Sequence, residues 1–379
     1  MSTLKQQIAA EARRLGFQHF GVAPPDPPAG FDRYERWLAA GYQAGMNWMA
    51  TERSRFRRAD PRRILPECQS VVVLGMHYQP QPAARKTAFK ISPSRGKIAS
   101  YAWGDDYHDI LPDRLRALVA FIEKQVGHPI PNRWYTDTGP ILERELAQRG
   151  GLGWIGKNGC LIHPQAGSYF VIAEILLGLD LPADDPFPSD HCGNCTRCID
   201  ACPTGCILPD RTVDANRCIS YLTIEEKGVI PSDLRPKLGN WVFGCDICQQ
   251  VCPWNQQFAP PAEEARFYPR PGVDQPILQD ELALTPQAFN RKFKGSPIKR
   301  TKRRGYLRNV AVALGNTGTP ADLPALEQAL TDPEPLVRAH AAWAIGEIGG
   351  EQAQKILNAR LQVENDEMVL TELQAAIQA

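Results

Sequence analysis

The chain has 379 residues, of which 43% are hydrophobic and 22% are charged, and its formal net charge is +1. This composition is ordinary for a globular protein and excludes an intrinsically disordered or collagen-like chain. The length predicts two or three domains, and no run of about 18 apolar residues predicts a membrane span.

The N-terminal part of the chain mixes helix and strand patterns. Residues 1–17 predict an amphipathic helix without the apolar core of an export signal, so we expect a cytoplasmic protein whose thiols stay reduced. Short apolar runs at 69–75 and 168–179 predict buried strands. Two helices and a glycine-rich loop are also expected, at 111–126, 140–148 and 150–157.

The C-terminal part of the chain carries a helical repeat. The segment 307–315 recurs loosely at 337–346, and a weaker third copy runs from Glu367 to the end. This period of about 30 residues predicts a short array of HEAT-like helix pairs, with an ordinary helical bundle as the alternative. The proline-rich stretch 258–276 predicts a linker.

Cysteines are concentrated in the middle of the chain. Nine of the 11 lie between Cys192 and Cys252, and in a reduced chain such a cluster is more typical of metal binding than of disulfides. The run Cys-x2-Cys-x2-Cys-x3-Cys-Pro that begins at Cys192 is the bacterial ferredoxin pattern. A second half-motif, Cys-x2-Cys-x3-Cys-Pro, begins at Cys245, and Cys218 upstream can supply its missing ligand.

These eight cysteines are enough for two [4Fe–4S] clusters. In two-cluster ferredoxins the cysteine before proline binds the other cluster. We therefore expect the first cluster to be bound by Cys192, Cys195, Cys198 and Cys252. The second cluster is expected to be bound by Cys202, Cys218, Cys245 and Cys248. A pair of zinc knuckles is the alternative. The three cysteines left over are expected to be packed thiols, namely Cys68, Cys160 and Cys206.

A basic segment precedes the helical repeat. From Leu282 to Ala321 there is no Asp or Glu, and the same stretch holds nine Lys or Arg between Arg291 and Arg308. This local excess predicts a surface for a phosphate backbone, although such a run is often only a solvated face. A second basic patch, at 53–63, could meet the phosphates of a cofactor or of a nucleic acid.

The motifs taken together resemble one family, the epoxyqueuosine reductases, which carry out the last step of queuosine synthesis in tRNA. The resemblance covers about residues 15–314 and includes both ferredoxin half-motifs. Its other matching stretches are Gly45–Met49, Tyr107-His108, Asp137–Arg144, Gly151–Lys157, Arg217–Glu225 and Leu307–Asn316.

The resemblance implies an α+β multidomain fold with three parts. Residues 1–185 would form an α/β cobalamin-binding catalytic domain, 186–258 a ferredoxin-like domain with two [4Fe–4S] clusters, and 259–379 a linker and HEAT-like helices that bind tRNA. The implied reaction reduces epoxyqueuosine to queuosine in the tRNA anticodon stem-loop. We expect a monomer that receives electrons from an unidentified donor of low potential.

The resemblance also implies residue roles. Asp137 matches the aspartate that protonates the epoxide oxygen as the ring opens. A carboxylic acid keeps its proton near neutral pH only in an apolar, dry pocket, so we expect such a pocket around Asp137. Its alternative role is a helix N-cap. The residues implied to contact cobalamin are Arg58, His108, Asp137, Lys157, Ser168 and Ser220. The residues expected to contact tRNA are Lys299, Arg300, Arg303 and Arg308.

Two other functions fit parts of the sequence. A corrinoid iron–sulfur reductase of the dehalogenase type would act on a small molecule, which needs neither the basic segment nor the repeats. A non-catalytic nucleic-acid adaptor with structural metal would leave the large N-terminal region unexplained.

Overall fold

The structure is a computed structural model that describes residues 2–79, 95–188 and 190–378. The chain forms two compact units and contributes to each of them several times. The first unit comprises the described parts of Met1–Pro82, Asp105–Asn216 and Ile247–Tyr268. The second comprises the remaining described residues. The predicted domain boundaries at 185 and 258 stay a prediction, because each unit is built from several separate stretches of the chain.

A four-stranded antiparallel sheet forms the centre of the first unit. Its strands lie in the order β1 (His19–Ala23), β2 (Ser70–His77), β7 (Phe170–Leu177) and β4 (Asn132–Tyr135). The central strand β2 is buried along its whole length, since helices cover both faces of the sheet.

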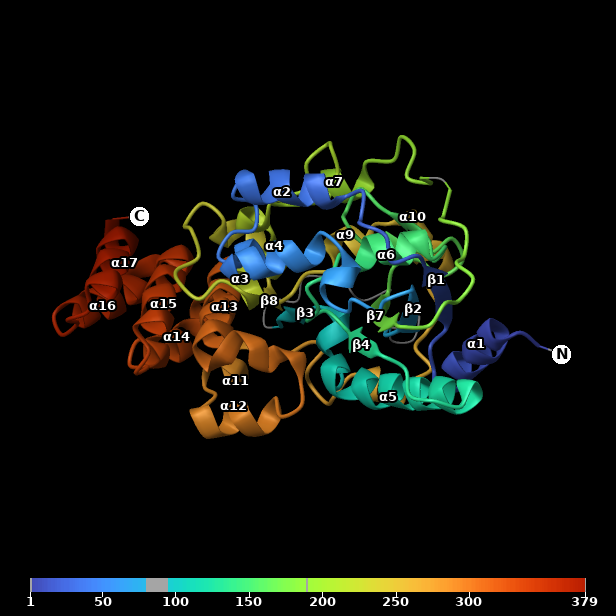
Figure 1. Ribbon diagram of the computed structural model, residues 1–379. Coiled ribbons are helices and arrows are strands. Elements are labelled where there is room, and N and C mark those ends of the chain that lie inside the picture. The colour runs from blue at the N-terminus through green and yellow to red at the C-terminus, as the bar shows by residue number, and fades with distance from the viewer. Residues whose placement is uncertain (1, 80–94, 189, 379) are drawn as a thin grey trace. The chain divides into compact units, whose positions relative to one another are not determined.

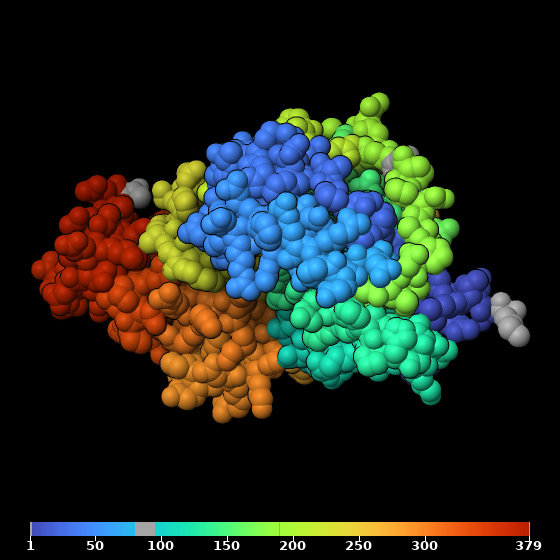
Figure 2. Space-filling view, in the orientation of Figure 1, coloured from blue at the N-terminus to red at the C-terminus, as the bar shows by residue number. Residues whose placement is uncertain are grey.

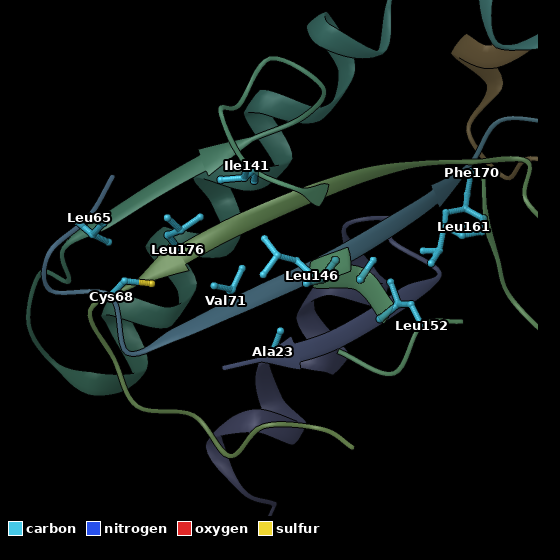
Figure 3. Packing of buried hydrophobic residues seen from close by; sticks show 12 residues of the cluster. Ala23, Leu65, Cys68, Val71, Ile141, Leu146, Leu152, Leu161, Phe170 and Leu176 are labelled. Carbon is cyan, nitrogen blue, oxygen red and sulfur yellow. The ribbon is translucent and has the colours of Figure 1, made fainter. Parts of the chain in front are cut away.

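Three helices cover these faces, namely α1 (Leu4–Arg14), α5 (Tyr107–Val126) and α6 (Glu143–Arg149) (Figure 1). α6 packs on the face of β2 that carries Val71 and Val73, and Figure 3 shows the apolar layer that results. α1 packs against β1 and α5, and Arg114 of α5 contacts Met76 on the opposite face of β2. The predicted α/β character of the N-terminal region is therefore confirmed.

Shorter elements surround this sheet. Between β1 and β2 lie α2 (Phe31–Ala39), α3 (Asn47–Ala50), α4 (Glu52–Arg58) and η1 (Pro61–Arg63). A small hairpin joins β5 (Trp154–Ile155) to β6 (Leu161–Ile162). The cysteine-bearing and following segments contain α7 (Arg197–Asp200), η4 (Ala215–Arg217), α9 (Ile247–Gln250), α10 (Pro253–Phe258) and η6 (Ala265–Phe267).

The second unit is mainly helical. Its two-stranded parallel sheet pairs β3 (Lys97–Ile98) with β8 (Trp241–Phe243). Its helices before the repeats are η3 (Ser100–Ala102), α8 (Ile219–Ile224), η5 (Arg235–Leu238), α11 (Leu278–Leu282), α12 (Pro286–Lys292) and η7 (Pro297–Thr301). The repeat region contains α13 (Lys302–Thr317), η8 (Pro320–Asp322), α14 (Leu323–Ala329), α15 (Pro335–Ile348), α16 (Gly350–Leu361) and α17 (Glu367–Gln378).

The three predicted repeat copies lie in α13, α15 and α17, and each of these helices packs against the next. Glycines allow the helices to approach closely. A Cβ added at Gly315 would lie 2.6 Å from the Trp343 ring, and one at Gly346 would lie 2.8 Å from the Cβ of Ala376. Contacts below 3.0 Å are not tolerated, so side chains at these two positions would push the helices apart.

Most predicted elements near the sheet are confirmed, but one boundary is wrong. The helix expected from Pro140 begins only at Glu143, because Leu142 has φ −96° and ψ 74° and is not helical. A Cβ at Gly139 would lie 2.6 Å from the Tyr135 ring, so the chain folds back closely on β4 there. Residues 136–142 are therefore a loop. Among the described residues, no helix is both long and apolar enough to cross a membrane.

Candidate active site and iron–sulfur ligands

Asp137 lies at the tip of a tight turn directly after β4. The N–H of Thr138 donates to the carbonyl of Thr136 at 2.6 Å, and Asp137 between them has φ +59°. This three-residue turn with positive φ is rare and strained for a residue with a side chain. Strain of this kind is concentrated at functional sites, so the backbone supports a functional role for Asp137.

The start of α5 supplies two donors to the Asp137 carboxyl. The Tyr107 hydroxyl donates to Oδ2 at 2.9 Å, and Nε2 of His108 lies 3.6 Å from the same oxygen. On its other side the His108 ring meets Asp106, 2.8 Å from Nδ1. Burial lowers the pKa of His108, but the two carboxylates outweigh it and raise this pKa to about 9. His108 is therefore a cation at neutral pH.

The expectation of an apolar, dry pocket around Asp137 is wrong for this arrangement. The Asp137 side chain is 65% exposed, and its neighbours on α5 are a hydroxyl and an imidazolium. The N-cap alternative is also wrong, since the residue before α6 is Leu142 and not Asp137. The structure therefore gives Asp137 a proton-bearing neighbour, His108, in place of an apolar enclosure.

Two glutamates with buried carboxyl oxygens lie behind the Asp137 turn, and neither was expected from the sequence. Glu143 is the first residue of α6, and its carboxyl accepts a hydrogen bond from the backbone N–H of Asp137. Glu174 lies within β7 and is completely buried. The signal that could have found Glu174 is its place inside the apolar run Phe170–Leu177, where an acidic residue interrupts the strand pattern.

Three of the residues expected to contact cobalamin come together at this turn. Besides Asp137 and His108 they include Arg58, at the end of α4, whose guanidinium contacts Ser54 and the carbonyl of Gly139. The polar donors gathered here fit the recognition of an amide- and phosphate-bearing cofactor.

The other residues expected to contact cobalamin are engaged elsewhere. Nζ of Lys157 donates to the carbonyls of Gly193 and Cys195, at 2.7 and 3.0 Å. Ser168 is buried and bonded to Asn255. Ser220 belongs to the second unit. The assignment of Lys157, Ser168 and Ser220 as cobalamin contacts therefore stays a prediction.

The four thiols expected to bind the first cluster converge within the first unit. Burial, together with the nearby Cys192, Cys252 and Cys195, raises the pKa of Cys198 to about 11. Nε1 of Trp154 donates to the sulfur of Cys192 at 3.4 Å. A hydrogen bond of this kind orients a thiolate and stabilises its charge when it binds a metal.

A cavity of about 350 Å³ lies between these thiols. Its lining residues are Lys157, Asn158, Ile162, His191, Cys192, Cys195, Arg197, Cys198, Cys252, Pro253, Trp254, Gln257 and Phe258. No three His, Cys, Asp or Glu side chains in the described part of the chain are placed to hold a single metal ion. A cubane differs from a single ion because each thiolate binds a separate iron at a corner of the cube. The residues therefore fit a [4Fe–4S] cluster.

The second set of four cysteines is divided between the two units. Cys202 and Cys248 belong to the first unit, and Cys218 and Cys245 to the second. Within the first unit, Thr204 and Cys206 contact the Cys202 sulfur, each at 3.4 Å. Cys206 is buried, as expected of a packed thiol. The second ligand set stays a prediction.

The structure corrects two of the residues expected to contact tRNA. Arg308 is completely buried, and its guanidinium donates to the carbonyls of Leu222, Glu226 and Gly228. Arg303 is nearly buried against Asp332. Neither guanidinium can meet a phosphate, because each is used to hold helices of its own unit together.

The other members of the basic segment are more accessible, and Figure 2 shows α12 and the chain after it (orange) at the molecular surface. Arg300 is 58% exposed and pairs with Glu225, whereas Nζ of Lys299 donates to Asn290. Lys302 and Arg304 are exposed, and the sequence analysis did not select them. Helical spacing could not have found this division, because Arg304 and Arg308 are four residues apart and lie on the same side of α13, which is buried on all sides from Gly305 to Leu314.

Comparison with known proteins reveals matches along most of the chain. Residues 58–138 match the family described as "Epoxyqueuosine reductase QueG, DUF1730". A 4Fe-4S double cluster binding domain matches 191–255, and HEAT repeats match 303–378. The epoxyqueuosine reductase of Pseudomonas aeruginosa is 40% identical over 345 residues, which cover 90% of this chain and 94% of that protein. The chain belongs to the epoxyqueuosine reductase family.

Other members of the family agree. The Escherichia coli epoxyqueuosine reductase is 39% identical over 92% of this chain and 90% of its own length. A crystal structure of an epoxyqueuosine reductase with an epoxyqueuosine-modified tRNA-Tyr stem loop is 32% identical, with a TM-score of 0.90 over 99% of this chain and 98% of that one. A Bacillus subtilis family member, captured with its catalytic aspartate loop swung out of the active site, has a TM-score of 0.89, 32% identity and the same coverage. The expected multidomain α+β fold, the HEAT repeats and the assignment as an oxidoreductase are thus confirmed.

The cysteine assignment predicts the result of replacing one ligand. We expect Cys198→Ala to lower the iron content of anaerobically reconstituted protein to about half, since one of two cubes loses a ligand. Iron and sulfide analysis measures this. Cys160→Ala is the matched control, because Cys160 lies near Cys252 but is not in the ligand set. Equal iron loss in both variants would contradict the assignment.

The carboxylates around His108 predict its titration. Asp106→Asn should lower the pKa of His108 from about 9, because Asn removes a charge but can still cap α5. The stability that ionised His108 contributes is complete below about pH 6.5 and is lost as the pH rises through about 9. NMR titration measures the shift, with Asp109→Asn as the control on the same helical turn. An unchanged titration in Asp106→Asn would refute the electrostatic explanation.

Proposed function

We propose that this protein reduces epoxyqueuosine to queuosine at the wobble position of tRNA, with cobalamin and two [4Fe–4S] clusters as cofactors. The single observation that carries the proposal is the strained Asp137 turn, in a chain 32% identical to a reductase that holds an epoxyqueuosine-modified stem loop. Residues of the family motif surround this turn on α4, α5 and α6.

The reaction removes the epoxide oxygen as water and leaves an alkene, which requires two electrons and two protons. Cobalamin, when bound, would supply a strongly reducing cobalt centre beside the epoxide. Asp137 is proposed to protonate the epoxide oxygen as the carbon–oxygen bond breaks, since an unprotonated alkoxide is a poor leaving group. Tyr107 orients the Asp137 carboxyl through its hydroxyl.

His108 is proposed to balance the charge of this carboxyl. Its imidazolium, 3.6 Å from Asp137, stabilises the carboxylate that remains after each proton transfer. Arg58 and His108 are also proposed to contact cobalamin. Lys157 and Trp154 are proposed to hold the loop and the Cys192 thiolate of the first cluster, through which electrons arrive one at a time.

The basic segment is proposed to contact the phosphates of the anticodon stem-loop. Lys299 and Arg300 are kept from the sequence analysis, and Lys302 and Arg304 replace the two buried arginines as exposed cations. We also propose a cytoplasmic monomer that takes electrons from a separate donor of low potential.

Replacement of Asp137 tests the proposed reaction. In single turnover with an epoxyqueuosine-containing stem-loop, anaerobically reconstituted and reduced Asp137→Asn should be slowed by about 10²–10⁴-fold, the usual worth of a general acid. Liquid chromatography with mass spectrometry of the nucleosides measures queuosine, and cobalamin and RNA binding should be unchanged. Asp109→Asn, on an exposed part of α5, should react like the wild type. A wild type that forms no queuosine would refute the function and make halogenated small molecules the next substrates to test.

Two arginines of α13 should behave differently in RNA binding. Arg304→Ala should weaken stem-loop binding and lower the slope of log K against log salt by about 1, as expected for one lost phosphate contact. Arg308→Ala should instead lower the unfolding temperature, because buried carbonyls lose their donor. Fluorescence anisotropy and thermal unfolding measure these effects. Binding by Arg304→Ala that is as tight and as salt-dependent as that of the wild type would refute the proposed phosphate contact.

A further inference from the structure

The two glutamates behind the Asp137 turn have no role in the reaction as described so far. Glu174 is 0% exposed, and among the described residues neither of its carboxyl oxygens has a hydrogen-bond partner. Oε1 of Glu143 is also buried and lacks a partner within the described part of the chain. Burying such groups costs stability, because their hydrogen bonds to water are lost and not replaced.

The sheet register explains why Glu174 lies in this position. On β7 it pairs with Val73 of β2 and with Tyr135, the last residue of β4. Alternation along the strand puts Glu174 on the same face as Ile172 and Leu176, which pack in the apolar layer under α6. An apolar side chain would satisfy this position structurally, so folding alone does not explain an acid there.

The two carboxyls and Asp137 form a continuous electrostatic group. The Asp137 N–H donates a hydrogen bond to the Glu143 carboxyl. The charges of Glu143 and Asp137 both raise the pKa of Glu174. The charged groups that face Glu143 are Asp137, Arg144 of its own helix and Arg58 of α4. Across from Glu174, β2 presents the uncharged Val73.

Burial keeps both glutamates protonated at neutral pH. Burial of its carboxyl and the Asp137 charge together raise the pKa of Glu143 to about 8, although the Asp137 N–H and the two arginines lower it. Burial also raises the pKa of Glu174 well above its usual value, with Glu143 and Asp137 adding to the effect. Neutral carboxyls hold transferable protons. The Glu174 side chain is completely buried, whereas Glu143 is partly exposed and has its Oε1 atom buried.

We propose that Glu143 and Glu174 form an internal proton store that reprotonates Asp137 during epoxide reduction. The inference rests on the proposed function, in which Asp137 is the acid. Both glutamates act through Asp137 and touch no substrate.

The proton balance fits the reaction. The epoxide oxygen takes one proton from Asp137 and a second one before it leaves as water, while two electrons from the external donor enter the organic product. Asp137 holds only one proton at a time, so its carboxylate must be recharged between the two transfers. In the described part of the chain, the Glu174 oxygens and Oε1 of Glu143 bond to no other carboxyl, so each transfer requires a side-chain rotation that brings two carboxyls into contact. Glu143 would then supply this proton, Glu174 would protonate Glu143, and the pair would recover its proton from solvent after product release.

Glutamine variants test the store without changing side-chain size. In single turnover near pH 7, Glu143→Gln and Glu174→Gln should each slow queuosine formation by at least about tenfold while RNA and cobalamin binding stay unchanged. In the wild type the rate should fall as the pH rises through about 8, where Glu143 loses its proton, and this fall should be absent in Glu143→Gln. Glu145→Gln is the matched control, because Glu145 lies on the same helix but bonds to the N–H of Gly30. Its rate and pH profile should match the wild type.

Infrared spectroscopy provides a readout that does not depend on activity. The wild type near pH 7 should show the carbonyl bands of protonated, buried carboxyls, and each glutamine variant should lack one of them. Glu174→Leu guards against misfolding as an explanation, since it should raise the unfolding temperature and still slow the reaction.

The outcomes separate this inference from the proposed function. Wild-type protein that forms no queuosine would overturn the function. Infrared bands that are unchanged in both glutamine variants would overturn the proton store, whatever the wild type does. Normal rates and an unchanged alkaline limb in both variants of an active enzyme would also overturn it.

Discussion

The antiparallel pairing of β7 with β2 and β4 is the constraint on which the candidate active site depends. This register sets Glu174 opposite Tyr135, and β4 ends at that residue, one residue before Thr136 and the strained turn at Asp137. The Thr136 hydroxyl donates to the carbonyl of Ile172 at 2.9 Å, which ties the loop to β7. A slip of one residue would move Glu174 to the other face of the sheet and away from Glu143.

The surroundings of Asp137 suggest how one carboxyl can serve as an acid while partly exposed. On one side it meets the Tyr107 hydroxyl and the His108 ring, both from the start of α5. On the other side it adjoins Glu143, which burial keeps neutral. In the proposed mechanism Glu143 replaces the Asp137 proton after each transfer, so that Asp137 can act without an apolar pocket around it. This arrangement suits a reaction that consumes two protons at one oxygen.

The basic segment illustrates how helix packing sorts residues of one type. Arg308 and Arg304 are four residues apart on α13, yet the first is buried among carbonyls and the second is exposed. Arginine is well suited to both tasks, since its guanidinium carries five donors and stays charged. Its presence in a basic run therefore does not tell whether it faces RNA or the interior of the repeat array.

The sequence by itself determined the features that depend on local spacing. Apolar periodicity predicts a strand at 69–75, a helix at 111–126 and the repeat helices, which the structure contains as β2, as α5, and as α13, α15 and α17. Cysteine spacing predicts the iron–sulfur character of 191–255. Only the tertiary structure decided what depends on distant parts of the chain. It ended β4 before Asp137, began α6 at Glu143, buried Arg308 and brought Glu174 behind the turn. These outcomes result from strand register and helix packing, in which residues far apart in the sequence determine which side chains lose contact with water.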